Sequence, residues 1–184
     1  VLVFTRGHRH SFARATAALD QMGLSIQDAR ITPTADAGSL DTYLVLEDTG
    51  LPITDGQRMA AIERNLARSL SERGATAPAV TRRMPRQARM VTTATQVSFS
   101  ADPENGRTIL EVVAGDRPGL LSLIGKVLWD QRVDLHGAKI MTVGERAEDV
   151  FTVTDDNSRP LDEARCRSLA EALQLALDAH VAAA

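Results

Sequence analysis

The sequence predicts an α+β protein of two ferredoxin-like domains, each an antiparallel sheet with helices on one face. A shift of about 108 residues superposes the two halves, so that residues 41–48 fall on residues 149–156 and Pro52 falls on Pro160. Each half reads strand, helix, strand, strand, helix. We therefore expect a first domain at residues 1–80, an arginine-rich linker at residues 81–94 and a second domain at residues 95–184.

The first half supports this order element by element. Residues 1–5 read as a strand, and the next segment carries an apolar stripe at helical spacing, made of Phe12, Ala15, Thr16 and Leu19. Gly23 ends that helix, and residues 24–31 and 40–46 alternate as strands. Thr54 and Gln57 form a capping box, which predicts a helix with four inward side chains, Met59, Ile62, Leu66 and Leu70.

The second half repeats the pattern. The strand at residues 108–114 leads into a helix at residues 120–131, whose inward stripe is Leu120, Ile124, Val127 and Leu128. Two further strands precede a last helix with a stripe of Cys166, Leu169, Ala170, Leu173 and Leu177. Because the chain stops soon after this helix, we expect residues 95–101 to supply the missing edge strand through an Asn-Gly hairpin. In the first half, the equivalent strand is expected somewhere in residues 75–89.

Composition limits the classes of function. The net charge is -3, and 43% of the residues are hydrophobic, so neither nucleic acid nor a membrane is an expected partner. Only 3% of the residues are aromatic, too few for an RNA-binding sheet. A single cysteine and the lack of a signal peptide favour the cytoplasm. Since the sequence starts at Val1 within a strand, we expect it to be part of a longer protein.

The turn from Asp116 to Leu121 is the strongest candidate for a binding site. It joins a strand to a helix through Arg117, Pro118, Gly119 and Leu120. Backbone N–H groups at a helix N-terminus attract anions, and glycine allows a ligand to approach the backbone closely. The turn supplies no nucleophile or base, so it predicts binding of a small carboxylate and no catalysis. This prediction requires that the N–H groups of the turn are not already paired.

Other candidate residues have simpler explanations. His8 and His10 lack the further ligands that a metal site needs, so we expect solvated loop histidines and no metal. Asp41 and Asp149 start equivalent strands and are expected to stabilise turns. Trp129 is expected to pack between the domains or in a dimer. The arginines of the linker are either solvated or a docking strip for an acidic surface, namely Arg82, Arg83, Arg86 and Arg89.

The Asp116–Leu121 turn, the run Ala138-Lys-Ile-Met-Thr-Val-Gly-Glu-Arg-Ala-Glu-Asp-Val-Phe151 and the repeat together resemble ACT domains. The tandem pair is similar to the C-terminal end of the bacterial bifunctional PII uridylyltransferase/uridylyl-removing enzymes, over nearly the whole chain. The resemblance implies that two ACT domains pair side by side, within one chain or in a homodimer. It also implies a regulatory module that senses glutamine and controls uridylylation and deuridylylation of the PII protein.

In such pairs the ligand lies between the strand-to-helix turn of one domain and the second strand of its neighbour. The resemblance therefore assigns ligand binding to two segments: Asp116, Arg117, Pro118, Gly119, Leu120 and Leu121 in the turn, and Val133, Asp134, Leu135 and His136 in the strand. The first repeat departs from the motif, since Gly7-His-Arg-His10 replaces the Asp-Arg-Pro-Gly turn. Its second strand, residues 24–31, is still able to form one wall of a shared site.

The motifs of both activities of the resembled enzymes are absent from this sequence. A transferase site needs aspartates spaced Asp-x-Asp, and a hydrolase site needs His followed by Asp; neither pattern occurs. We expect no catalytic residue and no cofactor here, with Mg²⁺ serving catalytic domains elsewhere in the parent enzyme. The alternative is an ACT-type module of another multidomain enzyme that binds no ligand and acts by docking.

Overall fold

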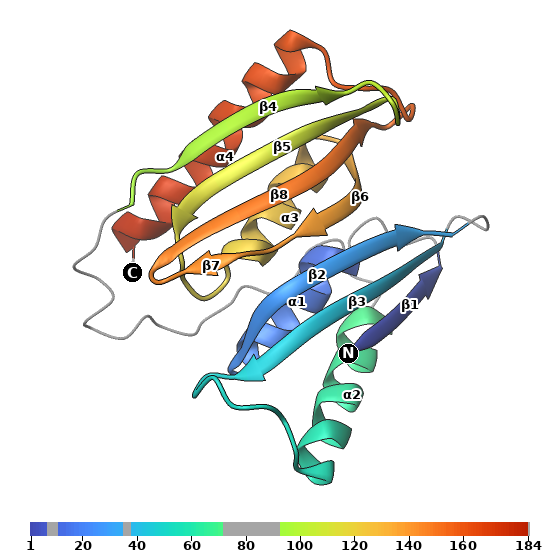
Figure 1. Ribbon diagram of the computed structural model, residues 1–184, viewed down its shortest axis with the longest axis vertical. Coiled ribbons are helices and arrows are strands. Elements are labelled where there is room, and N and C mark those ends of the chain that lie inside the picture. Colours follow the sequence, from blue (N-terminus) through green and yellow to red (C-terminus); the bar gives the residue numbers. More distant parts are fainter. Residues whose placement is uncertain (7–10, 35–37, 72–92, 184) are drawn as a thin grey trace.

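The computed structural model describes residues 1–6, 11–34, 38–71 and 93–183. In this part of the chain, two antiparallel sheets carry four helices, so the architecture is α+β as predicted (Figure 1). None of these helices is long and apolar enough to cross a membrane.

The first half contains β1 (Leu2–Arg6), α1 (Ser11–Gln21), β2 (Leu24–Pro33), β3 (Gly38–Glu47) and α2 (Gly56–Ser71). The strands form a three-stranded sheet in the order β1-β3-β2. Buried and exposed residues alternate along β1 and β3, so that Val3, Tyr43 and Val45 are buried on one face. The stripe predicted for the first helix is fully buried in α1. The region expected to supply an edge strand, residues 75–89, lies outside the described residues.

The second half contains β4 (Gln96–Asp102), β5 (Arg107–Gly115), α3 (Leu120–Asp130), β6 (Val133–Lys139), β7 (Thr142–Val143), β8 (Arg146–Asp155) and α4 (Glu163–Ala183). Its main strands are ordered β4-β5-β8-β6, and β7 pairs with β8. The segment expected at the sheet edge forms β4, which pairs antiparallel with β5. Leu169, Leu173 and Leu177 of α4 are buried as predicted, and Cys166 is half-buried.

Helix α2 differs from the prediction at its N-terminus and on one face. It begins at Gly56, and the N–H of Gln57 donates to Asp55 Oδ1 at 2.9 Å, so Asp55 caps it rather than Thr54. Met59 was expected inside but is 49% exposed, whereas Ile62 and Leu66 are buried. The first turn of α2 projects beyond the sheet (Figure 1). Met59 lines a cavity between β1 and α2 together with Ile53 and Ile62.

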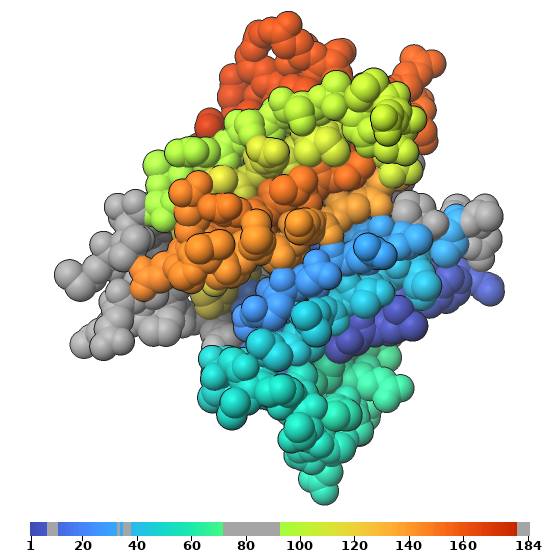
Figure 2. Space-filling view, in the orientation of Figure 1, coloured from blue at the N-terminus to red at the C-terminus, as the bar shows by residue number. Residues whose placement is uncertain are grey.

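The two halves lie side by side through equivalent elements. Strand β2 runs beside β6 (Figures 1 and 2). Behind these strands, α1 packs on α3 (Figure 1). Phe12 of α1 meets Phe151 of β8 edge to face, with ring centroids 6.1 Å apart. Gly125 of α3 permits the close approach of the helices, because a Cβ built on it would lie 2.9 Å from Ala13 Cβ.

Candidate cavity between the two halves

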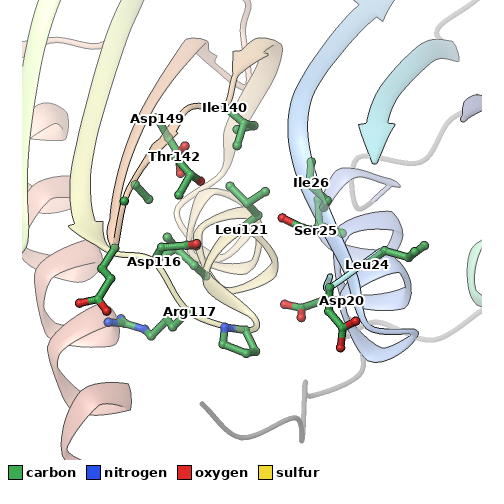
Figure 3. Close-up of a pocket in the computed structure, with 17 residues that line it drawn as sticks. Asp20, Leu24, Ser25, Ile26, Asp116, Arg117, Leu121, Ile140, Thr142 and Asp149 are labelled. Carbon is green, nitrogen blue, oxygen red and sulfur yellow. The ribbon is translucent and has the colours of Figure 1, made fainter. Parts of the chain in front are cut away.

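A cavity of about 280 Å³ lies where the two halves meet. The wall from the second half consists of the turn before α3 and the β7–β8 hairpin, and the wall from the first half consists of the end of α1 and the start of β2 (Figure 3). The volume is close to the lower limit of the roughly 300–1,000 Å³ seen for ligand pockets, which suits a small metabolite. A larger cavity of about 580 Å³ between β1 and α2 is lined mostly by apolar side chains.

The turn predicted to bind ligand borders this cavity. Five of its six residues line it, namely Asp116, Arg117, Pro118, Leu120 and Leu121. Gly119 is the N-cap of α3 and has φ 82°, a left-handed conformation that glycine adopts without strain. The predicted junction of strand, turn and helix is therefore present. The apolar side chain of Leu121 lies between the two walls of the cavity (Figure 3).

The backbone N–H groups of Asp116, Gly119 and Leu120 are already paired, whereas the sequence analysis required open N–H groups in the turn. The Gly119 N–H donates to Asp20 Oδ2, and Asp20 belongs to α1 of the other half. The Asp116 N–H donates to the carbonyl oxygen of Glu145 at 2.9 Å, and the Leu120 N–H donates to that of Arg117 at 3.2 Å. An internal carboxylate thus occupies the predicted anion position, where the α3 dipole favours negative charge.

Arg117 contributes its backbone and stem to the cavity, while its guanidinium points away. The side chain is 8% exposed, and a terminal nitrogen donates to the Leu177 carbonyl oxygen of α4 at 2.5 Å. Burial lowers the pKa of Arg117, and the charge of Asp178 opposes that shift. This hydrogen bond joins the turn to α4, so the Arg117 guanidinium is not aimed at a ligand.

The second predicted segment lies elsewhere. Val133 and Asp134 line a different cavity beside Trp129, Asp130 and Arg132, and neither Leu135 nor His136 lines the cavity at the turn. His136 Nε2 is 2.8 Å from Thr154 Oγ1, as expected of a structural hydrogen bond. The two predicted segments therefore do not form one site. Strand β6 belongs to the same half as the turn, and it lies against β2 of the other half.

The wall opposite the turn comes from β2, through Leu24, Ser25 and Ile26. This strand is the one that the sequence analysis allowed as a wall of a shared site. Residues 7–10, with His8 and His10, lie outside the described residues.

Asp149 is a cavity residue that sequence reasoning assigned to turn stabilisation. It lies on β8 and is only 1% exposed, and its Oδ2 has no hydrogen-bond partner. Burial raises its pKa from 3.8 to about 7, the Met141 N–H opposes the rise, and the Asp116 carboxylate adds to it. The signal available in the sequence was the match of Asp149 to Asp41 in the repeat, which identified the position but not its surroundings.

The cavity is acidic overall. Its lining includes five carboxylates, Asp20, Asp48, Asp116, Glu145 and Asp149, whereas Arg117 is its one basic side chain among the described residues. Such a lining favours a ligand with a positively charged or hydrogen-bond-donating group. Within the described part of the chain, no cluster of three or more His, Cys, Asp or Glu residues could hold a metal ion.

Comparison with known proteins identifies close relatives. The chain is 44% identical over 162 residues to a bifunctional uridylyltransferase/uridylyl-removing enzyme of Methylococcus capsulatus, covering 88% of the chain. It is 36% identical over 178 residues to the enzyme of the same name from Acinetobacter baumannii, and 38% identical over 175 residues to that of Pseudomonas savastanoi pv. phaseolicola. These matches cover 97% and 94% of the chain, respectively.

No family model matches the chain. The chain spans 18–20% of the length of these relatives, so it corresponds to a small part of each. The similarity nevertheless covers both halves of the molecule and the cavity between them. By this evidence most of the chain is homologous to one part of the bifunctional uridylyltransferase/uridylyl-removing enzymes.

Proposed function

We propose that this chain is a regulatory module of two ACT domains that binds glutamine in the cavity between them. In the parent enzyme, ligand binding would control uridylylation and deuridylylation of the PII protein. The observation that carries the proposal is the cavity itself, because it is built by the Asp-Arg-Pro-Gly turn of one half and β2 of the other. Homology to one part of these enzymes supports the link to uridylyl transfer.

The proposed mechanism is linkage between binding and the arrangement of the two halves. A ligand held by residues of both halves stabilises the arrangement that completes the site. Asp20 enters this mechanism directly, because its carboxylate occupies the N-terminus of α3. We infer that the carboxylate of glutamine replaces that of Asp20 there, while Leu120 and Leu121 cover the ligand's methylene groups.

Isothermal titration of the folded 184-residue chain with glutamine tests the proposal. We expect saturable binding of glutamine and weaker binding of asparagine, whose shorter side chain leaves part of the cavity unfilled. Glutamate is a useful second competitor, since its additional negative charge would enter an acidic cavity. A folded chain that binds no glutamine at millimolar concentration contradicts the proposal.

One observation favours a second function, that of a docking module without a ligand. The carboxylate of Asp20 already satisfies the Gly119 N–H, as a purely structural contact between the halves would. In that case the chain contributes no catalysis or ligand binding and acts by contacting other parts of the enzyme. It then binds none of the three amino acids, and Asp20→Asn only destabilises the contact between the halves.

A further inference from the structure

Two buried aspartates occupy equivalent places in the two halves. Asp41 on β3 pairs in register with Val3 of β1, and Asp149 on β8 pairs with Val112 of β5. Asp41 is 0% exposed and Asp149 is 1% exposed. A buried carboxylate is costly unless hydrogen bonds satisfy it, so the partners of each aspartate are informative.

The first half supplies Asp41 with hydroxyl donors. Ser39 Oγ donates to one carboxylate oxygen, the Tyr43 hydroxyl lies 3.5 Å from the other, and Ser11 is a further side-chain partner. These contacts make Asp41 an internal structural group.

The second half has lost all of these hydroxyls. At the positions that the repeat aligns with Ser39, Tyr43 and Ser11, it carries Ala147, Phe151 and Leu120. Asp149 keeps one long contact, from the Met141 N–H to Oδ1 at 3.4 Å, and its Oδ2 has no partner. A buried oxygen that is left unsatisfied beside a cavity marks a place for a donor from outside the protein.

We propose that Asp149 Oδ2 accepts the α-ammonium group of the amino acid, with Asp116 as a second carboxylate beside it. This inference rests on the proposed function and adds the residue that selects for a free amino group. The ammonium suits this place because the groups that line the cavity around Asp149 are themselves acidic, from α1 (Asp20), the end of β3 (Asp48), the turn (Asp116) and the hairpin (Glu145). Arg117 does not compete, since its guanidinium binds Leu177.

The geometry couples ligand binding to protons. Without ligand, burial raises the pKa of Asp149 to about 7, so the side chain is largely protonated in slightly acidic solution. An ammonium group placed against it favours the ionised form, and the proton leaves to the buffer. Glutamine binding should therefore release a large fraction of a proton near about pH 6, and almost none near about pH 8.5, where Asp149 is already ionised.

The experiment is titration calorimetry of the whole chain with glutamine in two buffers of different ionisation enthalpy, at about pH 6 and about pH 8.5. N-acetylglutamine, which lacks the ammonium, is the matched ligand and should bind about ten- to a hundredfold more weakly. Asp149→Asn should weaken glutamine binding by a similar factor and abolish the proton release.

Two further variants test whether the effects are specific to Asp149. Asp41→Asn changes the equivalent buried carboxylate in the other half and should leave the proton release unchanged. Ala147→Ser restores a hydroxyl at the position equivalent to Ser39, so it should satisfy Asp149 internally and weaken glutamine binding. If glutamine binds the wild-type chain but Asp149→Asn alters neither affinity nor proton release, the role of Asp149 is wrong while the sensor function stands. If glutamine does not bind the wild type, the proposed function itself fails.

Discussion

At the scale of single residues, two aspartates determine the chemistry of the cavity. Asp149 is buried on β8 with an unpaired oxygen, and Asp20 extends from α1 to the N-terminus of α3 in the other half. At both positions the surrounding protein strongly changes the free energy of a negative charge on the side chain. Each can therefore be tested by a substitution that removes the charge and keeps the shape.

Asp149 should make the free energy of unfolding fall as the pH rises. Its folded pKa of about 7 lies above the ordinary 3.8, so the folded state keeps a proton that the unfolded state has lost between these values. The stabilisation is fully present below about pH 4 and is lost as the pH passes 7. Asp149→Asn should therefore raise the midpoint of thermal unfolding by about 3–8 °C at pH 8, and by much less at pH 5.

Thermal melts of the two proteins at both pH values, without ligand, check this prediction. Asp28→Asn is the control, because Asp28 is exposed on β2 and the substitution removes the same charge. An Asp149→Asn effect of equal size at both pH values would show that titration of this residue is not its cause.

Asp20→Asn tests whether the internal carboxylate competes with the ligand. The amide removes the negative charge from the N-terminus of α3, where charge is worth about 0.3–1 kcal/mol or more. We expect glutamine to bind roughly two- to fivefold more tightly, since it no longer displaces a charged group. Titration calorimetry measures the effect, with Asp28→Asn again as the matched control. Weaker binding in Asp20→Asn would mean that Asp20 supports the site rather than competing for it.

At the scale of elements, the contact of α1 with α3 sets the distance between the two halves. Gly125 faces Ala13 and Phe12 so closely that an added methyl group would meet them at 2.9–3.0 Å. The neighbours are a helix backbone and a buried ring, which cannot move without shifting α1. The width of the cavity, which the same two helices help to frame, therefore depends on a glycine outside its lining.

Gly125→Ala should lower the free energy of unfolding by about 1–3 kcal/mol, even though alanine favours a helix more than glycine does. Gly56→Ala is the matched control, because Gly56 also lies in a helix and an added methyl group meets nothing within 4 Å. Urea unfolding of both variants provides the comparison. Equal stabilities for the two would indicate that the helices separate easily and that the contact is loose.

At the scale of the whole molecule, the paired halves should behave as one cooperative unit. Strands β2 and β6, helices α1 and α3, and the Phe12–Phe151 contact all join them. We expect scanning calorimetry to show one unfolding transition, with equal calorimetric and van't Hoff enthalpies. Two resolved transitions would mean that each half is stable alone, and the mechanism of linkage would then lose its physical basis.

Glutamine should raise the stability of the whole molecule by an amount set by its affinity. At a concentration about 100 times the dissociation constant, the expected gain is about 2.7 kcal/mol. Thermal shift measurements over a range of glutamine concentrations check this value against calorimetric affinity. N-acetylglutamine at the same concentrations is the control. If the midpoint of thermal unfolding does not shift at glutamine concentrations that saturate the calorimetric signal, the binding seen by calorimetry does not favour the folded state over the unfolded state.

The sequence alone determined the order of the elements, the repeat and the turn before α3. These features follow from local periodicity and turn residues, which need no knowledge of distant contacts. Local patterns misplaced only details, such as the cap of α2 and the exposure of Met59, since both depend on where the helix ends relative to the sheet.

The tertiary structure alone decided which residues share the cavity. Side-by-side packing of the halves brings β2, rather than β6, to the turn, and it brings Asp20 to Gly119 across 99 residues of sequence. It also leaves Asp149 without the hydroxyls that Asp41 has, although the two aspartates look alike in the repeat. The physical reason is that a hydrogen bond or a buried charge depends on distance and solvent exposure, and residues far apart in the chain set both.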